Sequence, residues 1–255
     1  MLKAALIPGI QDEPKDWKAL EEACSDFLEI TRIRRPRYRR EYDDNRRWKS
    51  WTGKVVKECR NQISTKQYDL LIGHSGGCKR VLDLIGNEHL PKTAVLFNPP
   101  RTKIEKGKVP DLRKIREQRN RERAKHKDKV PTRESVGMLL PLITNLPEEI
   151  WIPMVIRHGK HSLNGSVNRS RMITELKLHG KTREIADVIA EVDEEIHLLV
   201  LDAENDPWFA PIEERDNVKV HTDPEAGHYG LHMWKVDETK QRMRNFCLRT
   251  GLITQ

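Results

Sequence analysis

The sequence predicts an α/β protein with a mostly parallel sheet flanked by helices. Short apolar runs, each long enough for one buried strand, alternate with segments whose apolar residues recur at helical spacing. Strands that alternate with helices in this way usually join one parallel sheet. The runs that predict the sheet are Ala4–Ile10, Leu70–Ile72, Ala94–Phe97 and Ile196–Leu201.

Further elements follow from the same patterns in chain order. Alternating character predicts a strand at Leu28–Ile33 and a short one at Val218–His221. Amphipathic periodicity predicts several helices, which would cover the faces of the sheet. These helices are Asp16–Phe27, Asn45–Ser64, Lys79–Ile85, Thr182–Val192 and Glu238–Arg249.

Composition sets broad limits on the class of protein. A chain of 255 residues suffices for one α/β domain with an inserted subdomain, or for two small domains. No apolar stretch approaches about 18 residues, so no membrane span is expected. The apolar N-terminus is too short for a signal peptide and is better used as a first strand. The four cysteines form no CxxC pair, which favours buried thiols in the cytoplasm over a metal site or a disulfide framework.

The net charge of +8 is concentrated in one segment. Between Arg101 and Val130 the chain has thirteen Lys or Arg and five Asp or Glu, which accounts for the whole excess. Basicity is therefore a local property, and the composition does not indicate a protein that coats nucleic acid. A second basic cluster, Arg34–Arg40, surrounds Tyr38 and is balanced by nearby acids, as expected for a solvated loop, although contact with phosphates is the alternative.

The most informative motif is Gly-x-Ser-x-Gly at Gly73, Ser75 and Gly77, between a predicted strand and a predicted helix. A sharp strand-to-helix turn exposes the serine hydroxyl in a strained conformation, and the glycines relieve the crowding. The helix that follows directs free N–H groups and a positive dipole end toward the same point. This arrangement resembles the nucleophile elbow of the α/β-hydrolase superfamily.

The resemblance extends to the later strand ends. Asp206 lies in Glu-Asn-Asp-Pro after a buried strand, which resembles the loop that carries the triad acid, and His228 lies in a Gly-His after the last short strand. The resemblance thus implies a triad of Ser75, His228 and Asp206. Asp202 and Glu204 are alternative acids close by. Further candidates are less favoured: Asn98 follows another strand but is not ionisable, and His221 and His232 lack the glycine context.

The resemblance also implies an oxyanion hole made by backbone N–H groups. Gly76 would supply one donor, and Ile10 or Gln11, in the loop after the first strand, would supply the other. An ordinary strand-to-helix turn at Pro8-Gly9 is the alternative interpretation of that loop.

Residues 101–181 interrupt the alternation of strands and helices. This is the usual place for a cap or lid in the family that the motif resembles, so we expect residues 1–100 and 182–255 to form the core and residues 101–181 to form a basic cap. A flexible charged loop is the alternative. The apolar runs within the segment argue against disorder of the whole insertion.

These features predict a serine hydrolase, most simply a carboxylic-ester hydrolase that forms an acyl-enzyme and needs no metal or organic cofactor. The expected partner is a small acyl substrate, and the basic cap would favour an anionic one. Thioester or peptide hydrolysis and acyl transfer use the same chemistry. An alternative from another class is a binding protein with an idle triad, whose basic insertion contacts nucleic acid, anionic lipid or an acidic protein. The sequence predicts no particular oligomeric state.

Overall fold

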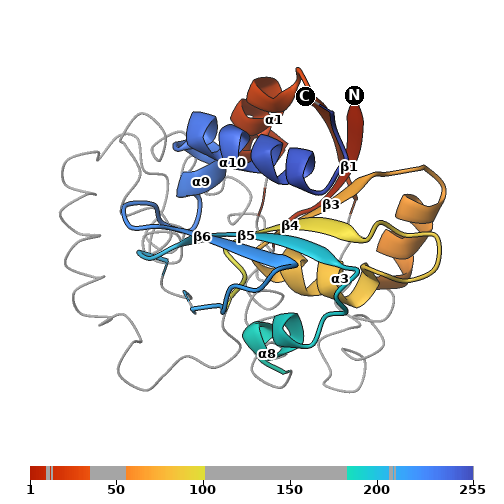
Figure 1. Ribbon diagram of the computed structural model, residues 1–255. Helices are drawn as coiled ribbons and strands as arrows, with labels where there is room; N and C mark the ends of the chain where they lie inside the picture. Colours follow the sequence, from red (N-terminus) through yellow and green to blue (C-terminus); the bar gives the residue numbers. More distant parts are fainter. Residues whose placement is uncertain are drawn as a thin grey trace, which may run out of the picture.

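The computed structural model describes residues 1–9, 12, 14–34, 56–100, 183–206, 209 and 211–254. Within these ranges, six parallel strands form one sheet in the order β2-β1-β3-β4-β5-β6 (Figure 1). The strands are β1 Leu2–Ile7, β2 Leu28–Arg32, β3 Leu70–His74, β4 Thr93–Phe97, β5 His197–Ala203 and β6 Val218–Asp223. The predicted fold class, an α/β sheet flanked by helices, is confirmed.

Helices cover both faces of this sheet. On one face lie α3, Gly76–Leu84, α8, Ile185–Ala190, and a helix over residues 56–64. On the other face lie α1, Lys18–Cys24, α9, Gly230–Met233, and α10, Val236–Arg249 (Figure 1). A short 3-10 turn, Pro14–Asp16, precedes α1.

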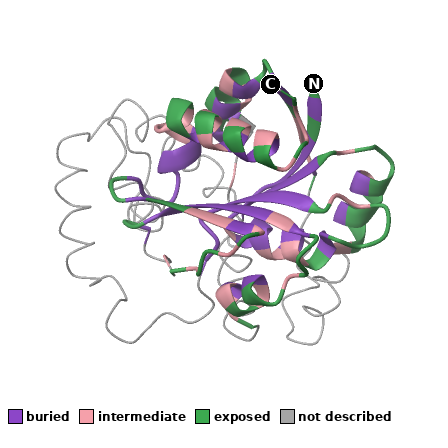
Figure 2. Ribbon diagram, in the orientation of Figure 1, coloured by how far each residue is buried: buried purple, intermediate pink, exposed green. Residues whose placement is uncertain are grey.

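Two hydrophobic clusters, one on each face, follow from the two-residue period of the strands. In β3, Leu71 packs into the cluster beneath α3, whereas Leu70 and Ile72 pack into the cluster beneath α1 and α10. Every residue of β3 and β4 is buried, as expected for central strands covered on both sides (Figure 2). The apolar runs were therefore sufficient to locate these strands.

The four cysteines divide equally between the two clusters. Cys59 and Cys78 belong to the cluster on the α3 face, and Cys24 and Cys247 belong to the cluster shared by α1 and α10. All four are buried and none forms a disulfide, which confirms the prediction of buried thiols.

The strand order reverses between β1 and β3. From β1 the chain moves outward to β2, and it then returns to place β3 on the other side of β1. In open α/β sheets, ligands bind outside the carboxyl ends of the strands at such a switch point. The carboxyl ends of β1 and β3 carry the Pro8-Gly9 turn and the Ser75 elbow, respectively.

Several element bounds differ from those predicted. β1 ends at Ile7 rather than Ile10, because Pro8 has no N–H for the ladder. α1 is shorter than Asp16–Phe27 and begins after the 3-10 turn.

The predicted helix Asn45–Ser64 is helical over its described residues, 56–64, and the rest lies outside them. The predicted cap, 101–181, and most of the Arg34–Arg40 cluster also lie outside the described residues. No helix in the described part of the chain is long and apolar enough to cross a membrane.

Candidate active site

The turn from β3 to α3 holds Ser75 in a strained backbone conformation. Its φ of 50° and ψ of −125° lie in a region that residues other than glycine rarely adopt. Ser75 is half-buried, whereas the residues on either side of it are buried. The Ser75 N–H donates to the Phe97 carbonyl at 2.9 Å, which ties the turn to the end of β4. Ser75 is thus more accessible than its neighbours in a turn that a backbone hydrogen bond holds in place.

Close packing explains both glycines of the motif. A Cβ on Gly73 would lie 2.8 Å from the Cys78 Cα, and a Cβ on Gly77 would overlap the carbonyl oxygen of Ile7 at the end of β1. Glycine at these positions lets α3 begin directly against the sheet. Gly76 is the first residue of α3, so its N–H belongs to the free N-terminal turn of that helix.

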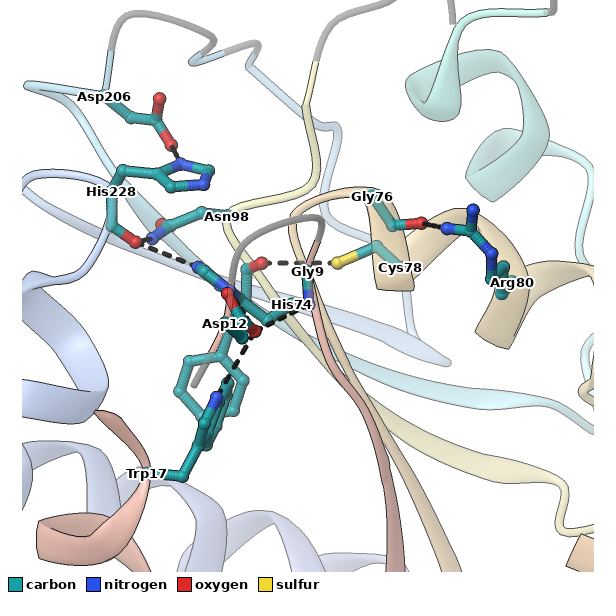
Figure 3. A network of polar contacts seen from close by, with 11 residues as sticks. Gly9, Asp12, Trp17, His74, Gly76, Cys78, Arg80, Asn98, Asp206 and His228 are labelled. Atoms are coloured by element: carbon teal, nitrogen blue, oxygen red, sulfur yellow. Dashed lines mark hydrogen bonds and ion pairs between the residues drawn. The ribbon is translucent and has the colours of Figure 1, made fainter. Parts of the chain in front are cut away.

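Asp206 and His228 form a buried hydrogen-bonded pair. Asp206 follows β5, and His228 lies in the loop between β6 and α9. The His228 Nδ1–H donates to Asp206 Oδ2 at 2.6 Å, and the two side chains are 3% and 1% exposed (Figure 3). Among the alternative acids, Glu204 is exposed, and Asp202 is buried with its Oδ1 accepting from the Ala203 N–H at 2.9 Å. Of the three candidate acids, Asp206 is therefore the one that the structure pairs with His228.

The elbow strand and the His228 loop are joined directly. His74, the residue before Ser75, places Nε2 3.1 Å from the His228 carbonyl oxygen, and the two imidazole rings have centroids 4.8 Å apart. The Asn98 Nδ2 donates to the same carbonyl at 2.5 Å.

Across the described residues, no hydrogen bond joins the Ser75 hydroxyl to His228. Of the predicted oxyanion donors, Ile10 and Gln11 lie outside the described residues.

Comparisons with known proteins identify the fold. No protein-family model and no curated protein matches the sequence. Among solved structures, a thermophilic esterase from Thermogutta terrifontis is 14% identical, with a TM-score of 0.61 over 98% of this chain and 90% of that one. The protein has the α/β-hydrolase fold. An esterase from Exiguobacterium antarcticum, 11% identical, has a TM-score of 0.60 over 96% and 91% of the two chains. An epoxide hydrolase from Bacillus megaterium, 17% identical, has a TM-score of 0.58 over 96% and 93%.

In this α/β-hydrolase fold, a second buried pair that the sequence did not predict lies beside the elbow. The His74 Nδ1 is 2.9 Å from Asp12 Oδ1 and 2.8 Å from Oδ2, and the two side chains are 0% and 1% exposed (Figure 3). The Asp12 carboxylate also accepts from the Gly9 N–H at 2.6 Å and from Trp17 Nε1 at 3.3 Å. No sequence signal connects Asp12 with a histidine 62 residues away.

Burial and charge act in opposite directions on this pair. Burial alone would raise the pKa of the Asp12 carboxyl, but the charge and hydrogen bond of His74 hold that pKa well below its usual range. Burial alone would lower the pKa of His74, but Asp12 raises it above the ordinary value for histidine. The direction for each partner is the one expected of a charged pair.

Two other ionisable groups near the elbow, His232 and Asp202, have pKa values shifted toward their uncharged forms. His232 stacks on Trp17 with ring centroids 4.2 Å apart, and burial together with the positive charge of His74 lowers its pKa well below the ordinary value. Burial, with the negative charge of Asp206, raises the pKa of Asp202 to about 8. Among the residues described, no cluster of three His, Cys, Asp or Glu could hold a metal ion.

Proposed function

We propose that this protein is a serine hydrolase that cleaves carboxylic esters with Ser75 as nucleophile, His228 as general base and Asp206 as the orienting acid. The observation that carries the proposal is the buried 2.6 Å hydrogen bond between His228 and Asp206, on loops at the same sheet edge as the strained Ser75 turn. A base held by a carboxylate close to an accessible serine is the arrangement that activates a hydroxyl.

The reaction follows from the roles of these groups. The Ser75 oxygen attacks the ester carbonyl carbon while His228 Nε2 takes the hydroxyl proton, and Asp206 stabilises the resulting imidazolium. The Gly76 N–H, with that of Ile10 or Gln11, stabilises the tetrahedral oxyanion. The C–O bond to the leaving alcohol then breaks as His228 returns the proton. Water attacks the acyl-enzyme with His228 again as base, which releases a carboxylic acid and restores Ser75.

The identity of the elbow residue favours esters over epoxides, although similar solved structures include both an esterase and an epoxide hydrolase. A serine that opened an epoxide would form an ether, which water does not cleave in a second step. A serine that attacks an ester forms a new ester, which water does cleave. The basic segment within residues 101–181 leads us to include acyl substrates that carry an anionic group.

The test is labelling by a fluorophosphonate probe, read by intact mass. We expect one adduct on the wild type and none on Ser75→Ala. Ser25→Ala is the matched control, because Ser25 is an exposed residue at the end of α1 whose hydroxyl donates to the Glu22 carbonyl, and it should retain the adduct. A panel of esters of increasing chain length and charge would then define the substrate class.

A folded wild type without an adduct would contradict this proposal. The binding alternative predicted from the basic insertion would then be tested by measuring polyanion affinity across a salt series, since charge-driven binding weakens steeply with salt. Ser75→Ala would leave such binding unchanged.

A further inference from the structure

The Asp12–His74 pair joins three loops at the carboxyl edge of the sheet (Figure 3). Asp12 belongs to the loop after β1, His74 ends β3 beside Ser75, and the carbonyl that His74 contacts belongs to His228 in the loop after β6. The first of these loops contains the predicted oxyanion donors, the second contains the nucleophile, and the third contains the base. One buried pair is thus in contact with the loops that carry the proposed oxyanion donors, nucleophile and base, and Asp206 lies in a fourth loop, after β5.

The contacts determine the charge of His74. Its Nδ1 faces the Asp12 carboxylate and its Nε2 faces the His228 carbonyl, and both partners are hydrogen-bond acceptors. A neutral imidazole has one N–H and satisfies only one of them, whereas an imidazolium donates to both. The Asp12 carboxylate supplies the opposite charge at 2.8 Å, as a buried cation requires.

The other ionisable groups around His74 are consistent with this state. Besides Asp12, His74 faces the rings of His228 and Tyr229 from the loop after β6 and the ring of His232 from α9. Asp206, after β5, adds a second negative charge that favours the imidazolium. His232 is held neutral by its burial, so it does not compete for the proton.

Asp12 extends the same network to the loop after β1. Its carboxylate accepts from the Gly9 N–H and from Trp17 Nε1, so the residues on both sides of Ile10 and Gln11 are fixed. A Cβ on Gly9 would lie 2.7 Å from Asp12 Oδ1 and 2.9 Å from His74 Nδ1, which shows how closely the loop approaches the pair.

We propose that His74, as an imidazolium paired with Asp12, is a positioning residue that holds the His228 backbone and the loop after β1 in place around Ser75. This inference rests on the proposed function, because it assigns His74 a role in that reaction. Hydrogen bonds from a cation are shorter and about twice as strong as neutral ones. A misplacement of about 1 Å among reacting groups costs up to about a hundredfold in rate.

Asp12→Asn tests the charge while preserving the shape. The amide oxygen can still accept from Gly9 and Trp17, and the amide N–H can donate to His74 Nδ1, so a neutral His74 keeps its bond to the His228 carbonyl and the variant should fold. We expect kcat on an activated ester to fall about tenfold or more, with KM within about twofold, because weaker neutral bonds hold the catalytic loops less firmly. Asp26→Asn is the control, because Asp26 pairs with Lys240 and Arg244 on the surface, and its kcat should be unchanged.

Nitrogen-15 NMR of histidine-labelled protein reads the charge directly. In the wild type at about pH 7.5, above the ordinary histidine pKa of about 6.5, both ring nitrogens of His74 should be protonated. In Asp12→Asn one of them should lose its proton. In the wild type alone, kcat should decline with rising pH at the same pH where His74 loses its charge, which keeps the test available if the variant fails to fold.

The two proposals fail in different ways. A wild type that takes no fluorophosphonate adduct contradicts the hydrolase proposal. A wild type that is labelled and hydrolyses esters, but whose His74 is neutral while the enzyme is active, overturns the positioning role alone. A folded Asp12→Asn variant with kcat within about twofold of the wild type has the same meaning, since the expected loss is at least about tenfold.

Discussion

The hydrogen bond from His228 Nδ1 to Asp206 assigns the two nitrogens of one imidazole to different tasks. With its proton at Nδ1, the ring accepts the serine proton at Nε2. Asp206→Asn permits the opposite tautomer, so we expect kcat to fall about 10⁴-fold with the fold intact. Ester hydrolysis measures the loss, and Glu204→Gln, at an exposed neighbouring acid, should leave kcat unchanged. A loss below about tenfold in Asp206→Asn would contradict the role given to this acid.

Asp202 predicts a pH dependence of stability. Its pKa is raised from 3.8 to about 8 by burial and by the charge of Asp206, so the folded state binds a proton that the unfolded state releases near pH 4. The unfolded state binds fewer protons across this window, and the free energy of unfolding therefore falls as the pH rises from 3.8 to about 8. Asp202→Asn retains the Oδ1 acceptor for the Ala203 N–H and removes the buried charge.

We therefore expect Asp202→Asn to raise the free energy of unfolding at pH 8 by at least about 1 kcal/mol, roughly the equivalent of one pKa unit. The gain should shrink as the pH falls and level off below pH 3.8, where the wild-type carboxyl is mostly protonated in both states. Urea unfolding at several pH values measures this. A gain of equal size at every pH would show that the charge of Asp202 is not the cause.

Single residues also show which parts of the candidate site could be predicted from the sequence and which could not. Ser75, Asp206 and His228 could be predicted as candidates because each stands in a local motif at a strand end, and the structure pairs the last two. Asp12 and His74 were missed because their pairing depends on how the loop after β1 folds back over β3, which no local pattern encodes. Asn98 was rejected as an acid because it is not ionisable, and its hydrogen bond to the His228 carbonyl, 130 residues away, was not predicted.

At the level of elements, the buried strands were the most predictable part of the molecule. β4, Thr93–Phe97, is within one residue of the predicted run Ala94–Phe97, because a short apolar run between polar and proline-rich flanks has few alternatives. α9 was not predicted, since four residues are too few to show a helical period. The ends of β1 and α1 were misplaced because a proline and a 3-10 turn end or delay them.

The junction of α3 with β1 can be tested at Gly77. A Cβ there would overlap the backbone carbonyl of Ile7, so Gly77→Ala must displace either α3 or the end of β1. We expect a loss of about 3 kcal/mol or more in the free energy of unfolding, at the upper end for overpacking, together with loss of fluorophosphonate labelling. Urea denaturation and intact mass measure the two effects.

Gly251→Ala is the matched control for that substitution. Gly251 has φ of +72° with no heavy atom within 4 Å of the added Cβ, so alanine there meets backbone strain without a clash. It should cost about 1–2 kcal/mol and retain labelling. Equal losses in the two variants would mean that the close approach of α3 to β1 is not what requires glycine at 77.

At the scale of the whole molecule, the described chain is one parallel sheet between two helical layers, with the candidate site where the strand order reverses (Figure 1). The four inner strands, β1, β3, β4 and β5, contribute alternate side chains to both hydrophobic clusters. Neither layer can detach without exposing apolar side chains of the same strands, so the two layers should lose their structure together.

The distribution of the cysteines makes this cooperativity measurable. Burial raises the pKa of the Cys24 thiol to about 12 and that of Cys247 to about 11, and it raises the pKa of Cys78 well above its ordinary value, so these thiols react little while folded. Pulsed alkylation in denaturant, read by mass spectrometry, should modify all four cysteines at one rate. If Cys24 and Cys247 were alkylated before Cys59 and Cys78, the layer of α1 and α10 would open first. The two pairs of native thiols thus report separately on the unfolding of the two sides of the sheet.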